Sequence, residues 1–101
     1  MTGVIRIVGV DPGSGATGWG VIDCAGSRLS FVAAGVVRPK RALSRAERLA
    51  FIHDALAALI AAHRPDEAAV EETFVNASPR DALVLGEARG VALLAPARAG
   101  I

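Results

Sequence analysis

Residues 4–20 read VIRIVGVDPGSGATGWG, which is an apolar run followed by an acid and a glycine-rich turn. Residues 4–10 are rich in Val and Ile and stop at Asp11-Pro12-Gly13, a turn signal, so they predict a buried strand. Residues 19–23 and 29–37 predict two further strands with a hairpin turn between them. Three strands joined by short turns indicate an antiparallel meander.

The turn itself matches the letters G-x-G-x-x-G over residues 13–18, as in dinucleotide-binding loops. That fingerprint needs a helix after the loop, whereas residues 18–23 read GWGVID and predict a strand. About 20 residues further on, where the fingerprint has an acid, stands Arg38. Two interpretations stay open: a flexible hairpin turn, or a turn that works with Asp11 and whose glycines let a phosphate approach. The second is shared by ribonuclease H-like nucleases and by actin-like kinases and ATPases.

The chain after this meander predicts a helix, a strand and a second helix. Residues 44–47 read SRAE, a capping-box pattern that opens a helix, and the helix should end just before Pro65. Residues 68–72 are apolar until their end and predict a fourth strand. Ser78 caps a second helix, expected to run to about Ala95 because a proline follows. The order is β-β-β-α-β-α, an α/β domain with a mixed sheet.

The composition excludes several broad classes of protein. With 52% hydrophobic residues among 101, the chain can bury a modest core and is not a disordered chain. The single Cys24 excludes an internal disulfide and fits a reducing compartment. No signal-peptide pattern opens the chain, and no apolar run approaches the ~20 residues of a spanning helix. We therefore expect a soluble cytoplasmic protein with no membrane partner.

Charge is balanced over the chain but uneven along it. The 11 Lys+Arg against 10 Asp+Glu give a net charge of +1, which does not by itself predict a nucleic-acid binder. Residues 38–48, however, hold Arg38, Lys40, Arg41, Arg45 and Arg48 against the single acid Glu47. This cluster can contact backbone phosphates and make binding salt-sensitive. A solvated loop and helix start is the alternative.

Acidic residues stand at the ends of two predicted strands. Asp11 ends the first strand, while Glu71 and Glu72 end the fourth, which follows a helical crossover and can lie parallel to the first. Neighbouring strands lie ~5 Å apart, so one carboxylate from each can share a Mg²⁺ ion, which prefers oxygen ligands. Strand alternation puts Glu71 and Glu72 on opposite faces, and spacing does not say which one faces Asp11. A turn-forming Asp and a solvated Glu pair are the alternative.

Two further features follow these acids. Phe74 lies in a polar segment, where it can wedge against unstacked bases or anchor the core. Arg80, nearby, is a candidate phosphate contact. Gly86 and Gly90 lie one helical turn apart and lower helix propensity, which indicates close packing on that helix face, either by a partner or by the protein's own sheet.

Three stretches of this sequence, in order, resemble the RuvC-type crossover junction endodeoxyribonucleases. They are residues 8–22 with VGVDPG and TGWGVI, residues 65–76 with AVEETF, and residues 78–90 with LGEARG. The resemblance extends over essentially the whole chain. It implies a ribonuclease H-like fold and a homodimer that cuts opposed strands of a four-way DNA junction, with a branch-migration helicase complex as a further partner.

The resemblance also implies roles for individual residues. The family holds Mg²⁺, two ions per subunit, with four carboxylates, of which Asp11 would be the first and Glu71 the second. Glu72 matches a position that is often Gln or Glu and is left out of the metal site. An aromatic residue at the position of Phe74 contacts the junction in the family, and the helix with Gly86 and Gly90 helps form the dimer interface.

The other two family acids lie in a later helix that nothing in this sequence matches. We therefore expect residues 1–101 to be the N-terminal part of one nuclease domain, incomplete at its C-terminus, that cuts junctions poorly or not at all. A non-catalytic fragment that binds junctions or dimerises is one alternative. An actin-like kinase or ATPase fragment is another, but it would need a second phosphate loop and an adenosine motif, and the sequence shows neither.

Overall fold

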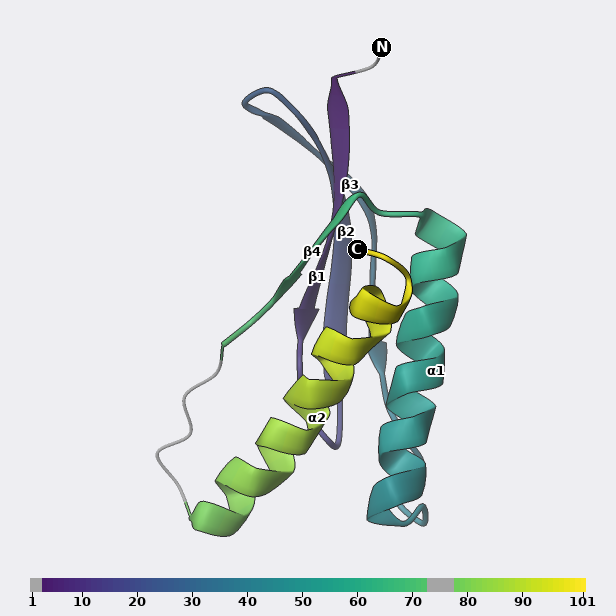
Figure 1. Ribbon diagram of the computed structural model, residues 1–101, viewed down its shortest axis with the longest axis vertical. Coiled ribbons are helices and arrows are strands. Elements are labelled where there is room, and N and C mark those ends of the chain that lie inside the picture. Colours follow the sequence, from purple (N-terminus) through teal and green to yellow (C-terminus); the bar gives the residue numbers. More distant parts are fainter. Residues whose placement is uncertain (1–2, 73–77) are drawn as a thin grey trace.

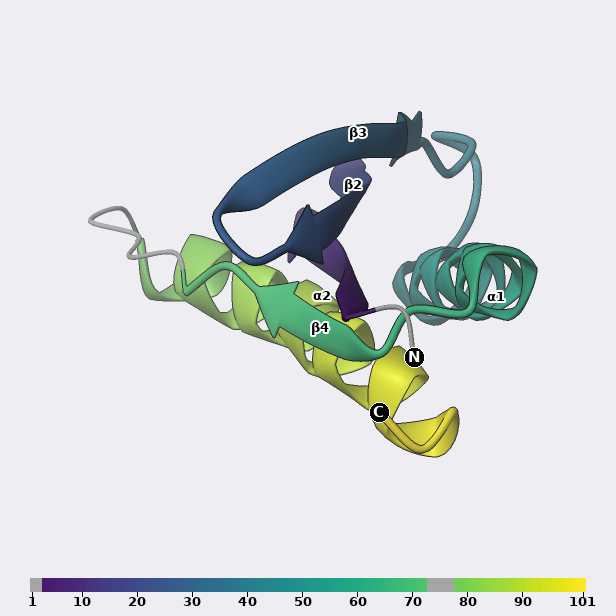
Figure 2. The same cartoon turned by 90° about the horizontal axis from the view of Figure 1, so that it is seen from above.

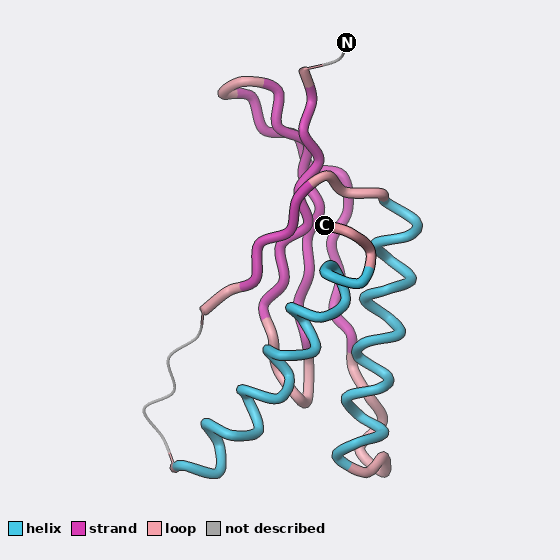
Figure 3. The backbone as a smooth tube through the Cα atoms, in the orientation of Figure 1, coloured by secondary structure: helices cyan, strands magenta, loops and turns pink. Residues whose placement is uncertain are grey.

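The computed structural model describes residues 3–72 and 78–101 and shows one twisted sheet with two helices packed against it (Figure 1). The order of strands and helices is the predicted one and can be followed along the backbone in Figure 3. The elements are β1 (Val4–Asp11), β2 (Thr17–Ala25), β3 (Arg28–Val37), α1 (Arg45–His63), β4 (Glu67–Val70) and α2 (Pro79–Arg98).

The sheet is mixed and has the strand order β3-β2-β1-β4. The strands β1, β2 and β3 form the predicted antiparallel meander, with a register shift between Val21 and Ile22. Gly26, with φ of +63°, turns the hairpin between β2 and β3, because a left-handed backbone favours glycine. The strand β4 pairs with β1 in parallel, since α1 returns the chain to the same end of the sheet.

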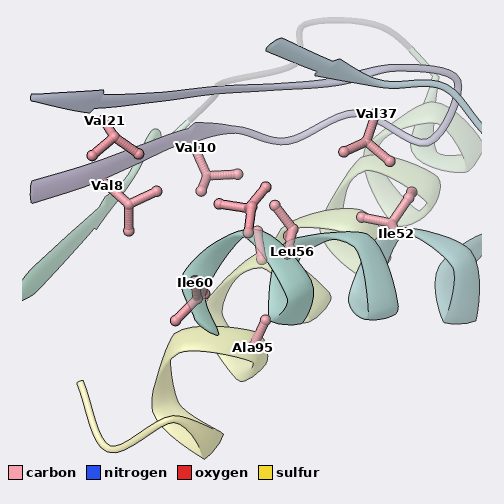
Figure 4. Close-up of a cluster of buried hydrophobic side chains, with 10 residues drawn as sticks. Val8, Val10, Val21, Val37, Ile52, Leu56, Ile60 and Ala95 are labelled. Carbon is pink, nitrogen blue, oxygen red and sulfur yellow. The ribbon is translucent and has the colours of Figure 1, made fainter. Parts of the chain in front are cut away.

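The core lies between one sheet face and both helices. Val8, Val10 and Val21 alternate along β1 and β2, so their side chains share a face, and each is at most 4% exposed. Figure 4 shows these valines directed toward α1, where Leu56 is fully buried, and toward the C-terminal half of α2. The opposite sheet face is more open: Leu29 and Phe31 on β3 are 66% and 76% exposed.

Three predicted elements differ from the structure in their bounds. The strand expected over residues 19–23 is β2, which runs two residues further at each end because its ladder with β3 extends from Thr17 to Ala25. The fourth strand covers Glu67–Val70 rather than residues 68–72. Its pairing with β1 ends at Val10 and Val70, because β1 itself stops at Asp11. The second helix continues through Pro96 to Arg98. Because Pro96 lies in the last turn, its missing N–H costs one helical bond, and its carbonyl still accepts from Ala99 and Ile101.

The start of α1 is as predicted. Ser44 accepts a hydrogen bond from the Glu47 amide at 3.2 Å, and the Glu47 carboxylate accepts one from the Ser44 amide at 2.8 Å. This capping box satisfies two amides at the helix start. The helix ends at His63, and Arg64 caps it with φ of +52° before Pro65. Within residues 3–72 and 78–101, neither helix is long and apolar enough to cross a membrane.

Candidate active site

Asp11 and Glu71 meet at the edge between β1 and β4, as the strand-end argument predicted. The parallel register pairs Gly9 with Ala69 and Val10 with Val70, so the next step along both strands sets Asp11 beside Glu71. The Glu71 amide continues the ladder by donating to the Val10 carbonyl at 2.9 Å. Because parallel strands alternate in step, the two acidic side chains project from the same sheet face.

The two carboxyl groups influence each other directly. A side-chain hydrogen bond with Asp11, followed by repulsion from the Asp11 charge, raises the pKa of Glu71 above its ordinary value, and partial desolvation adds to the effect. Glu71 beside Asp11 therefore keeps a proton to a higher pH than an isolated glutamate would. A divalent cation would satisfy both carboxylates without that proton.

The donor set fits Mg²⁺. This ion uses oxygen ligands and usually binds one or two carboxylates together with water and substrate phosphate. Both acids are exposed at the sheet edge, which leaves room for those further ligands. Among the residues that the structure describes, no group of three or more His, Cys, Asp or Glu side chains could hold a metal ion, so Asp11 and Glu71 stand as a pair.

The acids border an open depression of about 540 Å³ with a floor of glycines. Its lining is Gly9, Val10, Asp11, Gly18, Trp19, Gly20, Gly35, Ala69, Val70 and Glu71. A Cβ at Gly9 would meet nothing within 4 Å, so this glycine leaves free space beside the acids. Glu71 lines the depression and Glu72 does not, which answers the question that spacing left open.

The glycine-rich turn before β2 is a tight hairpin turn. The Thr17 hydroxyl donates to the Gly13 carbonyl at 2.7 Å, and the Gly13 amide donates back to that hydroxyl oxygen at 3.2 Å. A Cβ at Gly13 would overlap the Ala16 carbonyl oxygen, so the turn requires glycine there. A strand follows the turn, and therefore no helix N-terminus is available for a dinucleotide pyrophosphate, as the sequence indicated.

The basic cluster at residues 38–48 divides into two groups. Arg45 forms a two-pronged ion pair with Glu87 of α2, at 2.6 Å and 2.7 Å, and so joins the two helices. Arg48 donates to the Arg41 carbonyl at 3.3 Å. Arg38, Lys40 and Arg41 are exposed in the segment before α1. That segment lies at the same end of the molecule as the start of α2, where Arg80 is exposed (Figure 1).

Phe74 and the two glycines of α2 were also singled out in the sequence. Phe74 falls within residues 73–77, outside the described residues, so its role stays a prediction. Gly86 and Gly90 are exposed on α2, and a Cβ at either would meet nothing within 4 Å, so the protein's own sheet is not what packs there.

One contact at the acids could not be expected from the sequence. The Arg89 Nε, on α2, donates to the Glu71 carbonyl at 3.2 Å. The two residues are 18 positions apart, and nothing in the spacing signals that they meet. Only the packing of α2 beside β4, visible from above in Figure 2, brings them together.

Comparisons with known proteins agree with this geometry. A family model described as crossover junction endodeoxyribonuclease RuvC matches residues 7–101. The crossover junction endodeoxyribonuclease RuvC of Azorhizobium caulinodans is 58% identical over 99 residues, which cover 98% of this chain and 59% of that protein. The Methylocella silvestris protein of the same name is 59% identical over 97 residues, which cover 96% of this chain and 55% of that protein.

A solved structure extends the similarity to three dimensions. The structure of T. thermophilus RuvC in complex with Holliday junction substrate matches with a TM-score of 0.88 at 30% identity, covering 96% of this chain and 59% of that one. The chain therefore spans less than two thirds of the length of the relatives that it matches. With the paired acids, the glycine-floored depression and the mixed sheet of the ribonuclease H-like fold all in place, this chain belongs to the RuvC family of crossover junction endodeoxyribonucleases.

Proposed function

We propose that this chain supplies the first two metal ligands of a structure-selective DNA endonuclease that resolves Holliday junctions by Mg²⁺-dependent phosphodiester hydrolysis. The observation that supports this most directly is the placement of Asp11 and Glu71 side by side on one sheet face. A solved relative is described in complex with Holliday junction substrate, which supports a four-way junction as the ligand.

Asp11 and Glu71 would hold the metal through their carboxylate oxygens. The chemistry that Mg²⁺ supplies in such sites is activation of a water molecule and stabilisation of the leaving oxygen, with two ions ~4 Å apart in two-metal enzymes. The protein's own contribution is to fix the two acids at the strand ends and to keep side chains off the floor beside them. Gly9 and Gly20 pair across β1 and β2 there, so a phosphate can reach the acids without meeting a Cβ.

DNA contacts would come from exposed residues outside this depression. Arg38, Lys40 and Arg41 precede α1, and Arg80 lies in the first turn of α2. Their positive charges suit backbone phosphates, which most protein–DNA contacts engage without regard to sequence. Phe74 stays the candidate for contact with unstacked bases.

A homodimer is the proposed assembly, with α2 at its interface. The helix exposes Leu83, Leu93 and Leu94, which are 58%, 45% and 49% exposed. Gly86 and Gly90 leave its surface free of side chains between these leucines, so another helix can approach closely. The helix that packs against α2 would be the α2 of the second copy of the chain, as the family resemblance implies.

A second candidate function follows from the number of acids. Two carboxylates bind a divalent ion less firmly than four, and weaker binding reduces the stabilisation of the transition state. We therefore propose that residues 1–101, tested on their own, bind junctions but cleave them slowly. The alternative is a role in junction binding or dimerisation without any cleavage.

The test compares binding with cutting. The chain would be incubated with a labelled four-way junction and with a linear duplex of matched length, in Ca²⁺ for gel shifts and in Mg²⁺ for cleavage. We expect preferential junction binding and slow nicking that Asp11→Asn abolishes. The control is Asp54→Asn, an exposed acid on α1. Equal binding of both DNAs would refute the proposal, and rapid paired nicking would refute the proposed impairment.

A further inference from the structure

Both backbone polar groups of Glu71 are held by neighbouring elements. Its amide donates to the Val10 carbonyl of β1 at 2.9 Å. Its carbonyl accepts from the Arg89 Nε of α2 at 3.2 Å. Glu71 is exposed and lies one residue beyond β4, so side-chain packing does not fix its conformation, and the amide bond to Val10 is what ties it to the sheet. These two hydrogen bonds therefore hold its main chain, while the hydrogen bond with Asp11 engages its carboxyl group.

Arg89 projects from a firmly placed part of α2. Ala88 and Ala92, on the same stretch of the helix, are fully buried. Glu87 is tied to Arg45 of α1 through two short ion-pair contacts. The helix is fixed at this point by its contacts with the core and with α1. The position of the Arg89 guanidinium is therefore fixed as well, and its bond to the Glu71 carbonyl restrains the end of β4. Without it, the peptide group after Glu71 is free to rotate, and the strand end that carries the carboxylate can shift relative to Asp11.

We propose that Arg89 is a positioning residue for the metal centre, acting through the Glu71 main chain and touching neither metal nor DNA. This inference rests on the proposed function, since it requires that Asp11 and Glu71 share a divalent ion. Groups that orient metal ligands commonly change metal affinity by about 10-fold to 100-fold when removed. The bond here goes to the backbone of a ligand, so we expect the lower end of that range.

The test measures Mn²⁺ binding to the 101-residue chain by EPR titration, without DNA. Arg89→Met and Arg89→Gln both remove the guanidinium, and each should weaken Mn²⁺ binding by about 10-fold. Arg98→Met is the matched control, because Arg98 is an exposed arginine of the same helix. It should leave the affinity unchanged. Arg89→Lys, which keeps a donor on a long side chain, should recover part of the loss.

Thermal unfolding of each variant separates positioning from general stability, with every titration done well below the unfolding midpoint. Unchanged Mn²⁺ affinity in both Arg89→Met and Arg89→Gln, whatever their midpoints, would overturn the role of Arg89. Asp11→Asn, titrated in parallel, tests the centre itself. If it weakens binding while the Arg89 variants do not, only the positioning role fails; if it binds Mn²⁺ like the parent chain, the shared metal site fails as well.

Discussion

At the scale of single residues, the feature on which the site depends is the interaction between the Asp11 and Glu71 carboxyl groups. The Asp11 side chain raises the pKa of Glu71 through a hydrogen bond and through its charge. A carboxyl group with a raised pKa in the folded state adds stability at low pH, and this is lost as the pH rises through the folded-state pKa. The pH range over which this stability is lost therefore begins near the ordinary glutamate pKa of 4.5 and extends above it.

This coupling predicts a measurable effect of Asp11→Asn. NMR titration of the Glu71 side chain should give a pKa above 4.5 in the parent chain and a value closer to 4.5 in the variant. The parent's thermal midpoint should also fall more than the variant's between pH 4 and pH 7, because Asp11 raises the pKa of Glu71 only in the parent chain. An unchanged Glu71 pKa in Asp11→Asn would show that the two acids do not interact.

At the scale of elements, α1 supplies the large side chains that the two helices bury in the core. Leu56 is fully buried against the valines of β1 and β2, whereas Leu29 on β3 is 66% exposed. Leu56→Ala should therefore lower the free energy of unfolding by about 2–5 kcal/mol, through reduced burial and a cavity. Leu29→Ala makes the same chemical change at the surface and should cost about 0.5 kcal/mol or less. Urea unfolding of both variants checks this, and similar losses in the two would contradict the packing described here.

The elements also show what the sequence could and could not predict. Hydrophobic periodicity and the SRAE capping box predicted each strand and helix, because these signals are local. The end of β4 and the passage of α2 through Pro96 were missed, since they depend on where β1 stops and on how a proline sits in a last turn. The pairing of Asp11 with Glu71 followed from topology. The contacts of Arg89 and Arg45 did not, because they require the position of α2 in space.

At the scale of the whole molecule, a net charge of +1 conceals an uneven surface. Arg38, Lys40 and Arg41 are exposed at one end, while Arg45 is engaged by Glu87. A plot of the logarithm of the junction association constant against the logarithm of the salt concentration should be a falling line. Replacing all three exposed residues with Met should reduce the steepness of that line by about 0.9 for each phosphate that the variant no longer neutralises. Arg98→Met serves as the control. Gel shifts over a salt series would decide, and an unchanged slope would remove these residues from the DNA interface.

The most direct test of a shared metal site is a double-mutant cycle of Mn²⁺ affinity with Asp11→Asn, Glu71→Gln and the two combined, with Glu72→Gln as the control. If one ion touches both acids, each single substitution should remove most of the binding, and the pair should lose little more. The Glu72 variant should bind like the parent chain. Independent, additive losses at positions 11 and 71, or a loss at Glu72 as large as that at Glu71, would contradict a single ion held between the two strand ends.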